Sequence, residues 1–378
     1  MILKDCLEKI IDNRGRNPKY YDNEVYPVID NVMIKNNYHP NIKEATRFID
    51  QETHDNFLRG YLEPNIPIMT LVGGGIGNVS LSIDDKSVIV QNTIGFKPKP
   101  EILDSIYLYY WFLYKQKELI QFNRGSGQPS IRKTDIENMD IDIKNINYQK
   151  KVSKILSEID EKIALNNKIN NNLYEMGDSL YNEYFGKYKD NLPSGYKIVK
   201  LNEVADNYDS KRKPMSSRER EQHRGIYPYY GATSIIDYVD NYIFDDTYLL
   251  MGEDGTVKTD EGYPVLQYIW GKNWINNHAH VLKGKKISTE LLMFALRKIN
   301  IENIITGAVQ PKINQENMNK IEFVIGSDSK NKELEIIFKN LMDKSKNIIE
   351  ENKRLEQLRD TLLPKLMNGE IDLDSIEV

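Results

Sequence analysis

The chain repeats itself, and this repeat constrains the fold more than any other feature of the sequence. Gln128-Pro129-Ser130-Ile131 is answered by Gln310-Pro311-Lys312-Ile313, at an offset of 310 − 128 = 182. The same offset carries apolar residues onto apolar residues without a gap, in the pairs Ile136/Met318, Met139/Ile321, Ile141/Phe323, Ile155/Ile337 and Leu180/Leu362. A chain that contains one scaffold twice is expected to build two similar units related by a pseudo-two-fold axis.

Upstream of this shared block the register changes. Leu3-Lys4-Asp5 best matches Leu201-Asn202-Glu203, at an offset of 201 − 3 = 198. The segments before the two shared blocks therefore differ in length by 198 − 182 = 16 residues, and their sequences hardly match. A constant half beside a divergent half indicates one scaffold that holds two different recognition regions.

Two stretches, 148–186 and 331–363, carry apolar side chains seven residues apart. Such a strict repeat is typical of a coiled-coil seam. Because a perpendicular pseudo-two-fold axis reverses the chain direction, we expect the two long helices to pair antiparallel. Pro364 should end or kink the second helix at Leu363. The predicted seam residues are Val152, Ile159, Asn166, Leu173, Leu180, Leu334, Leu341, Ile348, Leu355 and Leu362.

Asn166 interrupts the first seam at the position where the second copy has Ile348. A polar residue buried in a seam typically fixes the register of the helices at some cost in stability. The alternative is a gap filled by solvent, and the sequence leaves both interpretations open.

The remaining segments are typical of two mixed domains. Predicted strands are 68–72, 88–90, 139–143, 248–251, 265–270 and 321–325, and predicted helices are 106–117 and 289–298. A polar turn around Pro193 and Gly195 marks the start of the second domain. The predicted class is therefore α+β, with two mixed α/β recognition domains alternating with two long helices. The boundaries are 1–147, 148–188 for the first helix, 189–330, and 331–378 for the second helix and tail.

The composition is that of a globular protein, with 40% hydrophobic and 28% charged residues. The single cysteine excludes a disulfide framework and fits a reducing cytoplasm. The sequence contains no signal peptide and no apolar stretch long enough to span a membrane, so a cytoplasmic location is expected. The net charge of −5 disfavours non-specific DNA binding, and the isolated chain is expected to bind DNA weakly.

Two motifs suggest chemistry and are assigned structural roles. The glycine-rich segment 73–77 lacks the lysine and hydroxyl residue of a phosphate loop, so a turn after a strand is expected. His278 and His280 would point to one face of a strand, but a metal site needs further ligands. A packed or hydrogen-bonded pair is expected, and no metal or catalytic residue is assigned.

Side chains suited to DNA contacts gather in the divergent halves and beside the repeated motif. Arg, Lys, Gln and Thr donate to phosphates and base edges, and Tyr accompanies them in both halves. A solvated loop is the alternative for each region. The candidate DNA-binding residues are Arg14, Arg16, Lys19, Arg124, Gln128, Lys211, Arg212, Lys213, Tyr229, Tyr230, Thr306 and Gln310.

Taken together, segments 127–131 and 310–313, the C-terminal segment 355–369 and its degenerate first copy at 173–180 resemble the specificity subunits of type I restriction–modification enzymes. The resemblance covers nearly the whole chain. It implies two target recognition domains that each read one half of a split double-stranded DNA target, with the helices acting as a ruler.

The resemblance also implies the partners. The helices would dock two methyltransferase subunits, which carry catalysis and S-adenosylmethionine, and a restriction and translocase subunit would complete the nuclease. The chain itself would hold no cofactor and would not be an enzyme. Two alternatives remain: a self-contained nuclease or methyltransferase with fused DNA readers, and a duplicated coiled-coil scaffold without a DNA role.

Overall fold

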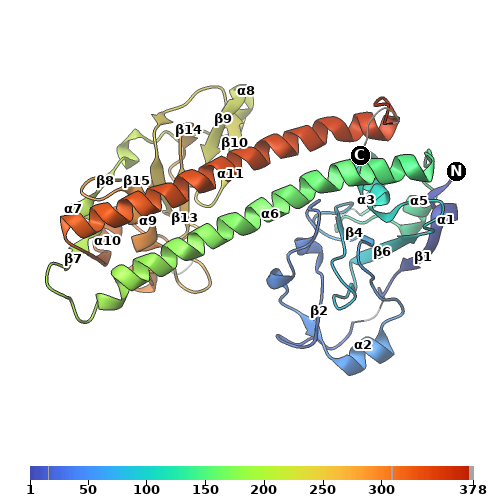
Figure 1. The fold of residues 1–378 in the computed structure, drawn as a ribbon, viewed down its shortest axis with the longest axis horizontal. Coiled ribbons are helices and arrows are strands. Elements are labelled where there is room, and N and C mark those ends of the chain that lie inside the picture. Colours follow the sequence, from blue (N-terminus) through green and yellow to red (C-terminus); the bar gives the residue numbers. More distant parts are fainter. Residues whose placement is uncertain (16, 126, 308–309, 374–378) are drawn as a thin grey trace. The chain divides into compact units, whose positions relative to one another are not determined.

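The computed structural model forms two compact units, Met1–Asn167 with Glu350–Val378, and Lys168–Ile349 (Figure 1). Both long helices, α6 (Ile146–Tyr184) and α11 (Asp328–Asn368), pass from one unit into the other. Each unit thus contains one globular domain and one half of each helix, a different grouping from the predicted domain boundaries, which stay predictions. The structure describes residues 1–15, 17–125, 127–307 and 310–373.

The two globular domains contain the same antiparallel sheet, which confirms the duplication predicted from the sequence. In the first unit the strand order is β1-β6-β4-β5, and in the second it is β8-β15-β12-β13. The strands are β1 (Leu7–Ile11), β6 (Thr93–Pro98), β4 (Pro67–Thr70) and β5 (Val79–Leu81), matched by β8 (Ala205–Asn207), β15 (Ala279–Gly284), β12 (Tyr248–Gly252) and β13 (Leu266–Ile269).

The helices that flank the two sheets also correspond. Short helices precede β1 and β8 at the predicted offset of 198, and a buried helix follows β6 and β15. The buried helices begin at equivalent caps, because the side chain of Asp104 accepts from Tyr107 N and that of Ser288 accepts from Leu291 N. The matched helices are α1 (Leu3–Cys6) and α7 (Leu201–Val204), α3 (Ser105–Tyr114) and α9 (Thr289–Leu296), and α5 (Lys133–Glu137) and α10 (Gln315–Asn319).

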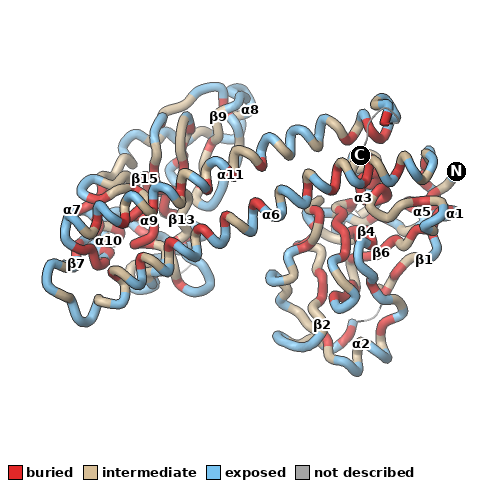
Figure 2. Tube along the Cα trace, viewed as in Figure 1, coloured by how far each residue is buried: buried red, intermediate tan, exposed pale blue. Residues whose placement is uncertain are grey.

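Each domain has its own apolar core, which includes the nearest halves of both long helices (Figure 2). In the first unit, α3 is apolar on all sides and is buried between the sheet and the helices. Burial of apolar area on this scale is the main favourable contribution to folding. The helix residues in the first core are Val152, Leu156, Leu363, Leu366 and Met367, and those in the second are Tyr181, Phe185, Leu334, Phe338 and Met342.

Within the first unit, α6 and α11 run antiparallel. Near the start of α6, the hydroxyl of Tyr148 donates to Leu366 O near the end of α11 at 2.8 Å. Further along α6, Asp160 is paired with the earlier α11 residue Arg359. The Nδ2 of Asn166 donates to Oδ1 of Asn352 at 2.8 Å, and Asn166 is buried, so this polar contact lies inside the helix pair. Of the ten predicted seam residues, five are buried and five are half-buried. Their position agrees with the seam, whose role in pairing stays a prediction.

The second helix does not end at Pro364, so that part of the prediction is wrong, while a kink there stays a prediction. The helix α11 continues through Pro364 to Asn368, and Gly369 follows with a φ of +73°. Leu366 and Met367 are buried in the first core, and burying two such side chains contributes about 1.5–3 kcal/mol each. Their sum of about 3–6 kcal/mol is enough to offset the ~3 kcal/mol cost of proline within a helix.

Strands form at four of the six predicted places, β4, β12, β13 and β16 (Glu322–Ile325), whereas segments 88–90 and 139–143 form only isolated bridges. Segment 139–143 differs from its counterpart β16 in how far its partner segment pairs with it. In the second unit, β7 (Lys197–Lys200) pairs along the whole of β16. In the first unit the equivalent segment is Met1 and Ile2, and Ile2 pairs with Asp140 alone.

The predicted helix at 106–117 is divided at Lys115 into α3 and α4 (Gln116–Gln121), and the helix at 289–298 is confirmed as α9. The units differ most between the first strand and the central strand of the common sheet. The first inserts β2 (Tyr26–Pro27), β3 (Phe48–Ile49) and α2 (Gln51–Phe57). The second inserts α8 (Ser217–Gln222) and most of a further sheet, of order β10-β9-β14-β11, with strands β9 (Arg224–Tyr230), β10 (Ile235–Val239), β11 (Phe244–Asp245) and β14 (Lys272–Ile275).

Candidate nucleic-acid interface

In the first unit the repeated motif fastens a loop to the glycine-rich turn after β4. The amide of Gly73 donates to Pro129 O at 2.9 Å, and the amide of Ile131 donates to Leu71 O at 2.9 Å. A third bond, from Arg124 N to Ser130 O at 3.0 Å, closes the loop on itself. The loop is therefore held by backbone groups at both of its ends.

The second unit makes the same three bonds at residues 182 positions later. Gly255 N donates to Pro311 O at 3.0 Å, Ile313 N donates to Glu253 O at 2.8 Å, and Thr306 N donates to Lys312 O at 2.8 Å. The offset of 182 thus holds for backbone geometry upstream of the motif, where the two sequences no longer match. Two units with different sequences present one loop in the same way.

Glycine is required inside both loops. A Cβ atom on Gly125 would lie 1.7 Å from the carbonyl oxygen of Gln128, and one on Gly307 would lie 2.2 Å from that of Gln310. The turn that receives the first loop also needs glycine, because φ is +93° at Gly73 and +80° at Gly75. The turn predicted for segment 73–77 is therefore confirmed.

The motif glutamines lie on the surface of these loops. Gln128 and Gln310 are both exposed, and the side-chain amide of neither makes a hydrogen bond within the described part of the chain. A free primary amide can pair with the N6 and N7 edge of adenine. The geometry agrees with the predicted role of both residues, which stays a prediction.

In the second unit, a basic segment runs from η4 (Asp209–Lys211) through α8 to the first residue of β9. Lys213, Arg218 and Arg224 are exposed and have no carboxylate within ion-pair distance among the described residues. The ammonium of Lys211 lies 4.9 Å from the ring centre of Tyr208 and is also exposed. Helix α8 begins at a capping box, in which Ser216 and Glu219 exchange hydrogen bonds, so Glu219 serves the helix end.

Two candidate residues, Arg212 and Tyr229, make contacts inside the second unit, and their DNA contacts stay predictions. The guanidinium of Arg212, 12% exposed, donates to Glu253 at 2.7 Å and to Ala279 O at 2.7 Å. Tyr229 is 1% exposed, and its hydroxyl accepts from Met215 N at 2.9 Å. Neither side chain reaches the surface, because each satisfies a polar group inside the second unit.

The other candidates are partly engaged. In the first unit Arg14 is paired with Asp12 at 2.7 Å, and this hydrogen bond lowers the pKa of the Asp12 carboxyl. Exposed Arg124 pairs with Asp135 at 2.9 Å, and Lys19 lies over the ring of Tyr21. In the second unit, Thr306 Oγ1 donates to Lys312 O at 3.1 Å and Tyr230 is half-buried. Arg16 lies outside the described residues.

The second histidine of the pair lies in a buried charged cluster with Asp209, Glu253 and Arg212. His280 Nδ1 is 2.6 Å from Asp209, and Nε2 is 2.8 Å from Ile313 O, so both ring nitrogens are occupied. His280, Asp209 and Glu253 are close enough together to hold a metal. However, Arg212 and Lys312 already neutralise the carboxylates, so the donor set does not fit a cation. The expected hydrogen-bonding role is observed for both histidines, since exposed His278 contacts Asp254 at 2.6 Å.

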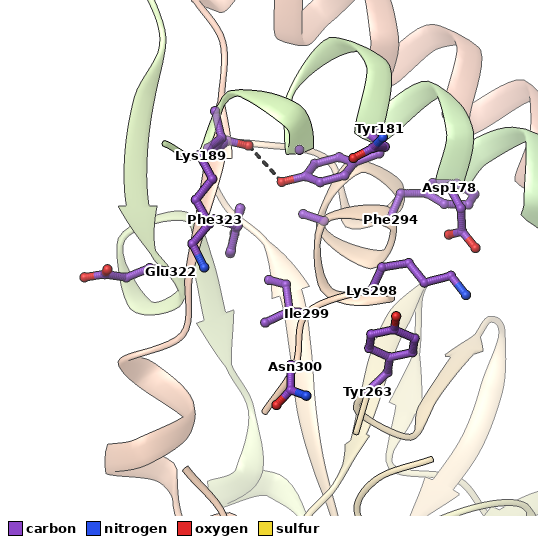
Figure 3. A pocket seen from close by; sticks show the side chains of 14 residues that line it. Asp178, Tyr181, Lys189, Tyr263, Phe294, Lys298, Ile299, Asn300, Glu322 and Phe323 are labelled. Atoms are coloured by element: carbon purple, nitrogen blue, oxygen red, sulfur yellow. Dashed lines mark hydrogen bonds between the residues drawn. The ribbon is translucent and has the colours of Figure 1, made fainter. Parts of the chain in front are cut away.

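A cavity of about 450 Å³ lies elsewhere in the second unit (Figure 3). Figure 3 shows Phe294 and Phe323 among its apolar walls, and the hydroxyl of Tyr181 donates to Val324 O at 2.9 Å. Lys189 and Lys298 also line it. None of the candidate DNA-binding residues lines this cavity, so it is separate from the loops described above.

The sequence did not indicate one feature of the second unit, an exposed apolar face on β9 and β10. Ile226 is 79% exposed, Ile236 is 49% exposed and Tyr238 is 48% exposed. The sequence signal that could have found it is the presence of large apolar residues beside polar and basic ones in Arg224-Gly225-Ile226 and Ile236-Asp237-Tyr238.

Among the residues that the structure describes, no helix has both the length and the apolar character needed to cross a membrane.

Two curated proteins resemble part of the chain. A putative type I restriction enzyme specificity subunit from Haemophilus influenzae is 36% identical over 126 residues, which are 33% of this chain and 32% of that protein. The type I restriction enzyme MjaVIII specificity subunit from Methanocaldococcus jannaschii is 28% identical over 145 residues, 35% of this chain and 34% of that protein. The chain thus matches about a third of the length of these curated relatives.

A solved structure extends the likeness to the whole fold. The crystal structure of a type I restriction–modification system S subunit from M. genitalium covers 97% of this chain and 95% of its own, with a TM-score of 0.57 and 18% sequence identity. The family model for the type I restriction modification DNA specificity domain matches residues 2–175 and again residues 193–359, one match for each copy of the repeat. The two matches cover most of the sequence, and the chain belongs to this family.

Proposed function

We propose that the chain is the non-catalytic DNA specificity subunit of a type I restriction–modification complex, in which each globular domain reads one half of a bipartite target. The observation that carries the proposal is the loop shared by the two units. The same three backbone bonds present Gln128 and Gln310, while the inserted elements beside these loops differ completely. Two domains that read different DNA sequences require a common loop that approaches the DNA in the same way, together with neighbouring elements that differ between the domains.

The long helices support the role of a ruler. The helix α6 has 39 residues, which corresponds to roughly 58 Å at about 1.5 Å per residue. Half-sites one DNA turn apart are separated by about 34–36 Å, so a helix of this length is long enough to set the distance between two DNA contacts. The buried Asn166–Asn352 contact in the first unit would hold the helices in one register.

The chemistry is assigned to partners. Two methyltransferase subunits would dock on the helices and bind S-adenosylmethionine, and a restriction and translocase subunit would complete the nuclease. The outer faces of α6 and α11 suit polar docking, since Lys154, Glu158 and Lys162 on α6 and Lys353 and Glu356 on α11 are exposed. The net charge of −5 predicts that DNA affinity rises when the basic surface of a partner joins the complex.

The proposal is tested by expressing the chain with a type I modification subunit and sequencing the methylated bases of the host genome. The expected result is one split motif that disappears when this chain is omitted. The purified chain alone, incubated with DNA, magnesium and S-adenosylmethionine, is expected to transfer no methyl groups. A methylation pattern that does not depend on this chain would refute the proposal.

The ruler is tested separately by removing one heptad from each helix. Because Asn166 contacts Asn352 in an antiparallel pair, the matched deletions are 163–169 and 349–355. Seven residues correspond to about 10.5 Å of helix, so the unread spacer of the methylated motif should shorten by about three base pairs. Deleting 163–169 alone is the control, because it breaks the register. An unchanged spacer in the matched variant would refute the ruler.

A further inference from the structure

The hairpin β9–β10 of the second unit has one apolar face that nothing in the described chain covers. Tyr238 lies opposite Pro228 in the strand register, so the two side chains share a face. Ile236 and Ile226 lie where the pairing of the two strands is irregular, and both side chains are exposed, Ile226 at 79% and Ile236 at 49%. A monomer rarely exposes neighbouring large apolar residues without a binding partner.

The opposite face of the hairpin is covered by helix α8. Asp237 and Tyr229 are register partners on that face, and Arg220 of α8 contacts both. Its Nε donates to Asp237 at 3.0 Å, and its guanidinium lies 5.2 Å from the ring centre of Tyr229. Figure 1 shows α8 next to β9 and β10. Helix α8 therefore packs on one face of the hairpin, and the apolar residues lie on the opposite, solvent-exposed face.

The charges around the hairpin favour an anionic partner. Lys213, Arg218, Arg224 and Lys272 have no carboxylate within ion-pair distance among the described residues, and Lys272 lies over the ring of Tyr242 at 4.6 Å. Most nearby carboxylates are engaged: Asp237 with Arg220, Asp240 with His223 and Asp246 with Lys283. In segment 208–247, only the carboxylates of Glu221 and Asp245 neither pair with a basic side chain nor cap a helix among the described residues.

We infer that the hairpin β9–β10 enters the major groove of the DNA half-site read by the second unit and packs Ile226 and Tyr238 against thymine methyl groups. The inference rests on the proposed function and adds the reading element and the chemical group that it reads. The hairpin forms the β10 edge of the sheet β10-β9-β14-β11. Proteins that read DNA with β-strands place them in a groove, and the major groove displays the C5 methyl group of thymine. Arg218, Arg224 and Lys213 would contact the flanking phosphates.

The experiment compares thymine with deoxyuridine, which lacks only the methyl group. A duplex carrying the methylated motif is made in two versions, with deoxyuridine replacing the thymines of one half or of the other. Binding of the complete complex with its modification subunits is measured for the native chain and for Ile226→Ala. Ile198→Ala is the matched control, since Ile198 is 41% exposed on β7, which belongs to a different sheet from the hairpin and lies outside the two long helices.

Each lost methyl contact should weaken binding about fourfold, which corresponds to ~0.8 kcal/mol for one buried methyl-sized group. The loss is expected for one half only, and Ile226→Ala should abolish the difference between thymine and deoxyuridine there. Ile198→Ala should leave that difference intact. The inference is overturned if the native complex does not distinguish the two bases in either half, or if the Ile226→Ala complex distinguishes them equally well. It is also overturned if Ile226→Ala prevents assembly with the modification subunits. Absence of any sequence-selective binding by the native complex would instead refute the proposed function.

Discussion

The first unit contains a buried polar triad whose removal should weaken that unit strongly. Asp160 on α6 is 3% exposed and accepts from Arg359 on α11 at 2.7 Å and from the hydroxyl of Tyr110 on α3 at 2.6 Å. Burial and the adjacent carboxylate of Asp160 raise the pKa of Tyr110, so its hydroxyl remains a donor. Burial acts to lower the pKa of Arg359, but Asp160 and Asp360 outweigh it, and the guanidinium stays charged.

Arg359→Ala should cost about 3–5 kcal/mol, because it leaves the carboxylate of Asp160 buried without a counter-ion. The first unit spans 167 + 29 = 196 residues. For a unit of this size, each kcal/mol shifts the melting temperature by about 2–4 °C, so the expected loss is roughly 6–20 °C. Arg354→Ala is the control, since Arg354 is exposed on the same helix and forms no ion pair in the described structure.

The second unit suggests how the stability can be restored. At the equivalent positions it has Phe294, Met342 and Gly177, at offsets of 184 for the buried helix and 182 for the long helices. Transferring these residues as Tyr110→Phe, Asp160→Met and Arg359→Gly removes the charge together with its partners. Replacing a buried ion pair by packed apolar groups is often neutral. Glycine costs about 1 kcal/mol in a helix, so the triple variant should melt within a few degrees of the native chain.

Stability is measured by thermal unfolding, with hydrogen exchange of α3 peptides reporting on the first unit and of α9 peptides on the second. Faster exchange after Arg359→Ala is expected in α3 and not in α9. The reasoning is refuted if Arg359→Ala is no more destabilising than Arg354→Ala, or if the triple variant is as unstable as Arg359→Ala alone.

Three further predictions concern the loops and the charged cluster of the second unit. Arg212→Ala should lower the free energy of unfolding by about 3–5 kcal/mol, because Glu253 loses its buried partner, while Lys213→Ala should change it by less than about 0.5 kcal/mol in the same chemical denaturation assay. Burial acts to raise the pKa of Asp209, but the hydrogen bonds of its carboxylate with His280 and Val281 N outweigh burial, so the pKa is lowered. Its contribution is therefore fully present above its unfolded pKa of about 3.9 and is lost as the pH falls below that value, so the stability gap between the native chain and Asp209→Asn should narrow on acidification from pH 6 to pH 3. Gly125→Ala should weaken methylation of the motif, because the new Cβ would lie 1.7 Å from Gln128 O, whereas Gly127→Ala meets nothing within 4 Å and should leave methylation unchanged.

The repeat and the long helices could be predicted because their signals are local and periodic. Apolar residues at seven-residue spacing place Val152 and Leu334 on the buried side of a helix whatever the partner is. The offset between the two copies needs only a comparison of the sequence with itself. These signals predicted α6 and α11 to within a few residues at each end.

The side-chain partners of the basic residues could not be predicted in this way. Arg212 and Lys213 are neighbours in one basic run, yet Arg212 is held by Glu253, 41 residues away, and Lys213 is exposed. Which of the two turns inward depends on β12 and β15, and this arrangement is not visible in the run itself. Pro364 was misjudged for a similar reason, since the burial of Leu366 and Met367 depends on a core formed by the other end of the chain.

The comparison of the two units separates what is shared for packing from what is shared for function. At one equivalent position in the core, the first unit uses the triad of Asp160, Arg359 and Tyr110, and the second uses an aromatic ring over a glycine. A Cβ on Gly177 would lie 2.1 Å from the ring of Phe294, so the single residues cannot be exchanged. The two cores are therefore packed differently at this position, so packing alone does not explain why the two units are alike elsewhere. The loops that carry Gln128 and Gln310 nevertheless keep the same three backbone bonds. Because the interior does not require this likeness, we propose that the surface does, through contact of both loops with a partner that has its own repeated geometry, such as DNA.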